Sequence, residues 1–279
     1  MNPTVSPQEW RTARIALLEK EKALTRARDA LNAERAALPW VRIEKPYRFA
    51  TARGPETLAE LFQGRSQLLV QHFMFGPDWT EGCVGCSLWA DHVDAALPHL
   101  AARGVGYVAI SRAPLDRLLA FRQRMGWKFD WVSSLDTDFN QDFGVTIPAE
   151  DVAAGRAEYN YRKLASGSGE FPGHSAFYRD AEGTVFHTYS AFGRGGEEIA
   201  STYMLLDLAP LGRNETNPAQ PMSWARHHDR YAAPAPQRKQ DEGPALDPSG
   251  ASPHRRESKV LSPTPLAVIR WWDEHDIPV

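Results

Sequence analysis

The chain has 279 residues, of which 42% are hydrophobic and 24% are charged. That apolar content excludes a disordered protein and suffices for one sizeable core with appendages. The 32 basic and 35 acidic side chains nearly cancel, so nothing electrostatic supports a nucleic acid or an acidic membrane as a partner. No apolar run approaches the roughly 20 residues of a spanning helix, and the start lacks a leader-like pattern. We therefore expect a cytoplasmic protein without nucleic-acid or membrane partners.

The first predicted element is a long helix. It begins at Ser6-Pro7-Gln8-Glu9, which reads as a capping hydroxyl, a first-turn proline and a glutamate that closes a capping box. Its apolar positions recur every seven residues: Trp10, Leu17, Leu24, Leu31 and Leu38. We expect residues 1–45 to be a helical extension whose narrow stripe packs against its own domain. A homodimer through this helix is the alternative.

Strands and helices alternate through the middle of the chain. A short helix is expected at 57–62, strands at 67–75, 106–111 and 129–133, helices from Cys86 to Leu100 and at 114–125, a β-hairpin formed by 175–180 and 184–189, and a helix at 197–206. Such alternation predicts an α/β domain of parallel β-α-β units over residues 46–231. The paired His227 and His228 are expected on a surface helix.

Proline, serine and charged residues dominate from Ala232 onward. Residues 232–279 therefore read as a linker that ends in an apolar segment around Leu266 to Trp272.

Both cysteines of the chain lie in one tetrad, Cys83-Val84-Gly85-Cys86, between a buried strand and an amphipathic helix. Two cysteines cannot form a disulfide scaffold, and in a reducing compartment such a pair is catalytic or metal-binding. Free amide groups and the helix dipole stabilise a thiolate at a helix start. We therefore assign Cys83 as the attacking thiol and Cys86 as the resolving thiol, with no metal or cofactor.

The strand, cysteine pair, helix and later hairpin follow the thioredoxin layout. In that layout a cis-proline precedes the hairpin and faces the disulfide, and Pro172 holds this position, with Pro148 as the weaker candidate. His174 follows it and is expected to face the sulfurs. Trp79 and Thr80 precede the cysteines in a turn-rich loop. We assign Trp79, Thr80, Pro172 and His174 to substrate binding.

Longer stretches of the chain resemble a known family. They are Val5–Pro39, Trp40–Lys45, Phe73–Trp79, Gly82–Ser87, Trp89–Asp91, Ser111–Pro114, Asp138–Asn140 and Asp142–Gly144. They look like the bacterial thioredoxin-like family catalogued as domain of unknown function 899, over about Val5 to Tyr231. The resemblance implies a thioredoxin-like fold, a central mixed sheet flanked by helices, and a dithiol-disulfide oxidoreductase. The Val84-Gly85 dipeptide differs from that of thioredoxin, which leaves open the direction of electron flow.

The expected reactants are a protein or small-molecule disulfide and an unidentified electron donor. A peroxiredoxin-like thiol peroxidase is the nearest alternative, since Pro77, Thr80 and Cys83 resemble the loop of that class and Arg112 would orient the peroxide. The other alternative is a copper or zinc site that combines the two cysteines with a histidine. The candidate histidines are His72, His92, His174 and His187.

Overall fold

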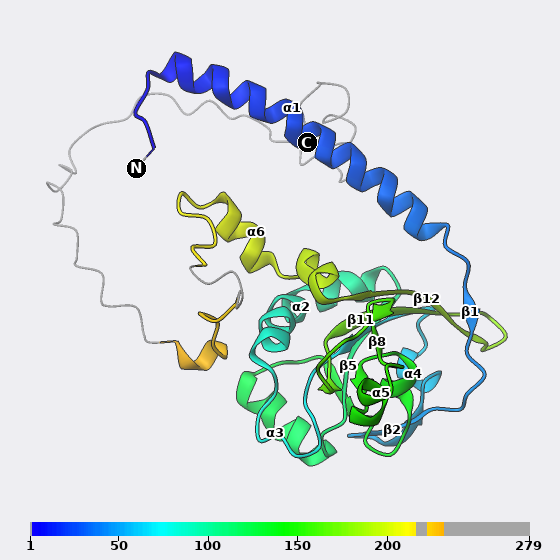
Figure 1. Cartoon of the computed structure of the whole chain (residues 1–279). Helices are drawn as coiled ribbons and strands as arrows, with labels where there is room; N and C mark the ends of the chain where they lie inside the picture. Colours follow the sequence, from blue (N-terminus) through cyan, green and yellow to red (C-terminus); the bar gives the residue numbers. More distant parts are fainter. Residues whose placement is uncertain (1, 216–221, 232–279) are drawn as a thin grey trace, which may run out of the picture. The chain divides into compact units, whose positions relative to one another are not determined.

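The structure is a computed structural model, and it describes residues 2–215 and 222–231 (Figure 1). The predicted linker and apolar segment of 232–279 lie outside the described residues. The described chain from Leu38 onward forms one compact unit, and the N-terminal helix belongs to another. Within the described ranges, no helix has both the length and the apolar character needed to cross a membrane.

Helix α1 (Pro7–Ala36) is capped as its sequence predicts. The Ser6 hydroxyl accepts a hydrogen bond from the Glu9 amide at 3.3 Å, and the Glu9 carboxylate accepts one from the Ser6 amide at 2.9 Å. None of its residues is buried, and Trp10 and Leu24 are 61% and 67% exposed. The leucine stripe of this element is therefore exposed along its whole length.

The compact unit is built on an eight-stranded mixed sheet in the order β1-β12-β11-β4-β5-β6-β2-β3. The strands are β1 (Val41–Arg42), β2 (Arg48–Thr51), β3 (Gly54–Thr57), β4 (Gln67–His72), β5 (Val105–Ser111), β6 (Asp130–Ser133), β11 (Gly173–Arg179) and β12 (Val185–Phe192). Strand β4 pairs in parallel with β5, and β5 with β6, while β11 pairs with β4 in antiparallel fashion. The predicted hairpin is confirmed as β11–β12.

Helices cover the sheet as the α/β prediction requires (Figure 1). Helix α2 (Val84–Ala102) follows β4, and α3 (Leu115–Met125) follows β5. Strand β4 sends Leu68 and Val70 into one hydrophobic core, whereas Phe73 and Phe75 just beyond it belong to a second core with Cys86. A central strand that precedes the cysteines, lies between a parallel and an antiparallel neighbour, and is followed by a hairpin confirms the thioredoxin-like fold.

An insertion separates β6 from β11. It holds α4 (Phe139–Asp142), β7 (Thr146–Ile147), α5 (Ala149–Ala153), β8 (Glu158–Tyr159), β9 (Arg162–Lys163) and β10 (Gly169–Glu170). Strands β7 and β10 pair with each other, and so do β8 and β9, as two small separate sheets. These strands are too short to show a period of two in the sequence.

Several short elements differ from their predictions. The region expected as a helix at 57–62 is the end of β3 and a 3-10 turn, η1 (Glu60–Phe62), and the helix expected at 197–206 is η2 (Gly193–Ile199) followed by α6 (Ser201–Leu208). The surface placement of His227 is wrong, because the residue is only 3% exposed and lies directly before η3 (His228–Arg230).

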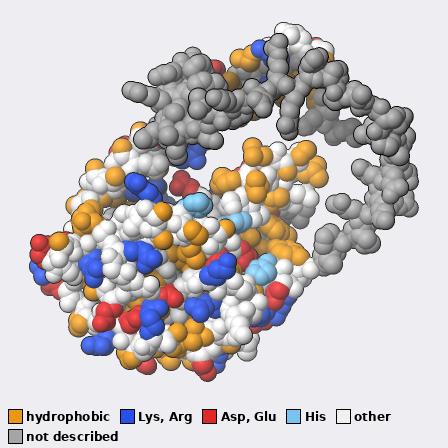
Figure 2. Space-filling view, turned by 180° about the vertical axis from the view of Figure 1, so that it is seen from behind, with side chains coloured by type: hydrophobic (Ala, Val, Ile, Leu, Met, Phe, Trp, Pro, Cys, Tyr) orange, Lys and Arg blue, Asp and Glu red, His pale blue; other side chains and the backbone are white. Residues whose placement is uncertain are grey.

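Basic, acidic and hydrophobic side chains are interspersed over the face seen in Figure 2.

Candidate thiol site

The two cysteines occupy the first turn of α2. Cys83 is the N-cap residue and is partly exposed, whereas Cys86 lies one turn further and is 1% exposed. Both are free thiols. The Ser87 amide and hydroxyl both donate to the Cys83 carbonyl, at 3.0 and 2.9 Å, and so fix the cap. The pair therefore has one thiol that a reagent can reach and one behind it.

Met74, just past the end of β4, holds both cysteines. Its carbonyl accepts a hydrogen bond from the Cys83 amide at 3.0 Å, and its own amide donates to the Cys86 sulfur at 3.5 Å. Behind them, the Gln71 side chain donates to the Cys86 carbonyl at 2.9 Å. Backbone and buried side chains of the central strand thus set the position of the thiol pair.

The two thiols have opposite acidities. A hydrogen bond from the Cys86 thiol, aided by the backbone amides of Cys86 and Gly85, lowers the pKa of Cys83 to about 6 against the opposing effect of burial. Burial raises the pKa of Cys86, and its bond to Cys83 adds to the effect. At neutral pH the pair is therefore a thiolate at Cys83 stabilised by a protonated Cys86, which is the arrangement that nucleophilic attack by Cys83 requires.

The loop before Cys83 is held by α3. One guanidinium nitrogen of Arg117 donates to the carbonyls of Pro77 and Trp79, both at 2.7 Å. Trp79 is 38% exposed and folds over Gly76, where an added Cβ would lie 2.9 Å from the indole nitrogen. Thr80 is exposed. Of these two assigned substrate residues, Trp79 shapes the loop and Thr80 lies on its surface.

Glycine is required at position 82, directly before Cys83. A Cβ at Gly82 would come within 2.7 Å of the buried Phe73 ring, a distance that real Cβ contacts do not reach. The close approach lets the loop pass directly over the core before Cys83.

Residues 222–231 return to the same site, which the sequence did not reveal. The buried His227 imidazole donates through Nε2 to the Gly82 carbonyl at 2.9 Å, so it binds the residue next to Cys83. The Met222 side chain lies against Gly85, where an added Cβ would be 3.1 Å from its terminal methyl group. No local sequence pattern marks these contacts, since they join positions about 140 residues apart.

Pro172 lies at the same end of the sheet as the cysteines. Gly173 pairs with His72, so continuing the register brings Pro172 opposite Phe73. The expected cis-proline is wrong, because every peptide bond in the described ranges is trans. Trans is the default geometry of a peptide bond. The flanking groups are bonded inside the protein: the Phe171 amide donates to the Val145 carbonyl at 2.8 Å, and the Pro172 carbonyl accepts from the Tyr159 hydroxyl at 2.6 Å.

His174 packs on α2 beside Trp89, with ring centroids 5.0 Å apart. Both its ring nitrogens and the Trp89 indole nitrogen are buried and have no hydrogen-bond partner. Burial lowers the pKa of His174 to about 4, so the ring is neutral at pH 7. His174 therefore touches the helix that carries the cysteines, one turn beyond Cys86.

The residues of the alternative interpretations are engaged elsewhere. The Arg112 guanidinium pairs with the nearly buried Glu170 carboxylate at 3.1 Å. The His72, His187 and His92 rings each hydrogen-bond a serine or threonine hydroxyl, Ser175, Ser190 and Thr202 respectively, at 2.7 Å. Within the described part of the chain, no three His, Cys, Asp or Glu side chains are grouped so as to hold a metal ion.

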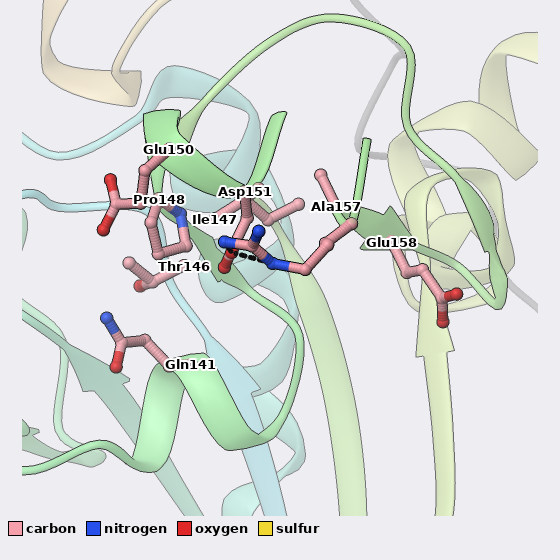
Figure 3. A pocket seen from close by; sticks show the side chains of 9 residues that line it. Gln141, Thr146, Ile147, Pro148, Glu150, Asp151, Ala157 and Glu158 are labelled. Carbon is pink, nitrogen blue, oxygen red and sulfur yellow. Dashed lines mark hydrogen bonds and ion pairs between the residues drawn. The ribbon is translucent and has the colours of Figure 1, made fainter. Parts of the chain in front are cut away.

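A pocket of about 330 Å³ lies in the insertion, apart from the thiol pair (Figure 3). It is lined by Gln141, Thr146, Ile147, Pro148, Glu150, Asp151, Arg156, Ala157 and Glu158. Arg156 and Asp151 form an ion pair at 2.6 Å within it. Pro148 lines this pocket, and neither cysteine contributes to it.

The fold and the thiol pair together define a thioredoxin-like protein with its Cys-x-x-Cys sequence at a helix start. The model of a family described as "Bacterial protein of unknown function (DUF899)" matches residues 1–231, and the chain belongs to this family. The predicted resemblance is therefore confirmed. A search of curated proteins found no match.

Solved structures with a similar fold include peroxiredoxins. Peroxiredoxin Q of Xanthomonas campestris (structure F4) is 15% identical, with a TM-score of 0.41 over 59% of this chain and 95% of that one. Peroxidoxin BcpB of Mycobacterium tuberculosis is 14% identical, with a TM-score of 0.39 over 59% and 95%. The hypothetical protein SMc02350 of Sinorhizobium meliloti is 17% identical, with a TM-score of 0.32 over 53% and 71%. Similarities this distant do not bear on the chemistry.

Proposed function

We propose that the protein is a dithiol-disulfide oxidoreductase in which Cys83 attacks and Cys86 resolves. The observation that carries the proposal is the asymmetry of the pair. Cys83 is partly exposed and its pKa is lowered to about 6, whereas Cys86 is buried and its pKa is raised. Attack requires a thiolate that can be reached, and resolution requires a thiol held beside it.

The reaction balances within the pair. The Cys83 thiolate attacks a disulfide R–S–S–R′, which forms a Cys83–S–S–R bond and releases R′S⁻. The Cys86 thiol transfers its proton to a leaving thiolate and attacks the Cys83 sulfur, which releases RS⁻. The substrate gains two electrons and leaves as one thiol, which carries the Cys86 proton, and one thiolate, which is protonated by water. The protein loses two electrons and becomes a disulfide; the reverse sequence oxidises a dithiol.

The lowered pKa of Cys83 indicates the direction of electron flow. Stabilising the thiolate stabilises the reduced form of the protein, which makes its disulfide the stronger oxidant. A dithiol whose attacking thiol titrates near 6 is therefore expected to have a reduction potential above the roughly −270 mV of thioredoxin.

Disulfide exchange is favoured over peroxide reduction by the partners of Arg112. That guanidinium is paired with Glu170, and Thr80 is exposed on the loop surface. The arginine proposed to orient a peroxide is therefore already bound by a carboxylate, which supports exchange over peroxide reduction.

The test uses the two serine variants as a matched pair. Reduced wild-type protein mixed with a disulfide should gain one intramolecular disulfide, detected by intact mass. Cys86→Ser should accumulate the mixed disulfide at Cys83, and Cys83→Ser should remain unmodified over the same interval. Equal behaviour of the two variants would refute the proposed roles.

A further inference from the structure

We propose that the site acts on low-molecular-weight disulfides, and that residues Met222–Tyr231, here called the strap, keep the disulfides of folded proteins away from Cys83. This inference rests on the proposed function and specifies its substrate class. It follows from what surrounds Cys83: the strap contacts Gly82 before it and Gly85 after it, and two backbone groups of the adjacent strand end are already bonded inside the protein.

The strap contacts the turn after Cys83 through Met222. Its side chain lies over Gly85, and the Cβ position of Gly85 is itself 3.8 Å from the Cys83 sulfur. The Met222 amide donates to the Glu215 carboxylate at 2.9 Å, and the Trp224 indole donates to the same oxygen at 3.0 Å. The thioether is thus held in place above the turn between the two cysteines.

The strap is also anchored at Gly82, before Cys83. His227 donates to the Gly82 carbonyl, and the Phe121 ring packs edge-on against the imidazole at 5.2 Å. Two ion pairs reinforce this end, because Glu81 binds Arg230 and Arg124 binds Asp229. The strap is therefore fixed to the residues immediately before Cys83 as well as to the turn after it.

A polypeptide substrate would also need a strand edge to pair with, through free N–H and C=O groups. At the strand end opposite Phe73 one such N–H group and one such C=O group are already bonded inside the protein. The Phe171 amide donates to the Val145 carbonyl, and the Pro172 carbonyl accepts from Tyr159. Tyr159 in turn accepts from the Gly193 amide at 3.0 Å, so the insertion and η2 close this edge together.

A small disulfide needs neither the edge nor a wide opening. Cys83 is partly exposed between the strap contacts, so a slender R–S–S–R molecule can place one sulfur in line with the thiolate. The exchange is the one written above: the protein loses two electrons and the Cys86 proton, and the small molecule leaves as one thiol and one thiolate, which takes its proton from water.

The test compares two disulfides on the reduced full-length protein: bis(2-hydroxyethyl) disulfide and insulin. Second-order rate constants for oxidation are measured from the loss of free thiols. We expect the wild type to react faster with the small disulfide. Met222→Ala should raise the rate constant with insulin about tenfold and change the rate constant with bis(2-hydroxyethyl) disulfide much less. Met204→Ala, an equivalent change at a 41% exposed position of α6, should alter neither.

A second variant guards against misfolding. Arg230→Gln removes an exposed anchor without touching the core, and it should shift the preference towards insulin in the same direction. Insulin oxidising the wild type as fast as the small disulfide, or an unchanged preference in both folded variants, would overturn the substrate assignment alone. A wild type whose Cys83 reacts with iodoacetamide but is oxidised by neither disulfide would overturn the proposed function itself.

Discussion

The acidity of Cys83 depends on a single neighbouring sulfur. The thiolate is stabilised first by the S–H of Cys86 and only then by backbone amides. Because each donor favours the charged form, loss of the strongest one should move the titration upward. The helix start alone is therefore not enough to set the reactivity of this thiol.

The corresponding prediction concerns alkylation. The rate of Cys83 modification by iodoacetamide should rise with a midpoint near pH 6 in the wild type, and Cys86→Ala should move that midpoint to higher pH. The measurement is the mass of the modified protein over a pH series. Cys83→Ser serves as the control, because the buried Cys86 should react slowly at neutral pH. An identical midpoint in the wild type and Cys86→Ala would contradict the role of the second thiol.

Buried neutral histidines predict acid lability. Burial lowers the pKa of His72 to about 3 and that of His174 to about 4, from 6.5. Below pH 6.5 the unfolded chain binds protons that the folded protein refuses, so stability falls as the pH decreases towards the folded pKa values. Each histidine should cost about 1.4 kcal/mol of unfolding free energy per pH unit in that window.

Denaturant titrations at pH 7, 6 and 5 measure this decrease of the unfolding free energy with falling pH. His174→Gln should remove its share of the slope, about 1.4 kcal/mol per unit, while His99→Gln, at an exposed position of α2, should leave the slope as it is. A wild type equally stable at pH 7 and pH 5 would show that these rings are not buried as described.

Individual residues of the site were predictable only where their chemistry is local. The position of the cysteine pair at the start of α2 follows from the tetrad and the helix after it. Arg117 and His227 were not predictable, because each acts through a carbonyl of a distant loop. Two adjacent histidines look like surface residues until the fold places one of them under Phe121.

Among the elements, α3 does more than cover the sheet. Its Arg117 bridges two carbonyls of the loop that leads to Cys83, and its Arg124 reaches Glu81 at 2.6 Å. Helix α3 therefore packs on β6 and also holds the loop before Cys83 in place.

Replacing that support should have a measurable effect. Arg117→Ala removes two charge-assisted hydrogen bonds and should cost about 1–2 kcal/mol of stability, with slower disulfide exchange because the loop no longer holds its geometry. Stability is measured by chemical unfolding and exchange by thiol loss. Arg103→Ala, at the exposed end of α2, is the matched control. Equal exchange rates for the two variants would exclude a positioning role.

Long periodic elements were predictable and short ones were not. The strands β4, β5 and β6 and the helices α2 and α3 appear close to their predicted positions, since each carries enough apolar residues to show its period. The paired strands β7–β10 and β8–β9 have two residues each, and their partners are fixed by tertiary contacts. The insertion that closes the strand edge beside Pro172 was therefore not predictable as structure.

At the scale of the whole molecule, α1 carries an exposed apolar stripe. Its apolar positions at seven-residue spacing include Leu17, Leu24 and Leu31, which are 50%, 67% and 49% exposed. We propose that a second copy of the chain covers this stripe, as a homodimer through the N-terminal helix.

Sedimentation of the full chain tests the homodimer. The wild type should sediment as a dimer at micromolar concentration, whereas Leu17→Glu with Leu24→Glu should be monomeric, because both changes place charge in the seam. A monomeric wild type would contradict the proposal.

The order in which the chain is synthesised gives the strap a further consequence. Both cysteines and the central strands leave the ribosome long before Met222 and His227, which complete the surroundings of Gly82 and Gly85. A nascent or prematurely terminated chain would therefore carry the acidic thiol without its cover, open to cross-linking with any protein disulfide it meets. Such fragments would then be lost through mixed disulfides with other proteins as well as through misfolding.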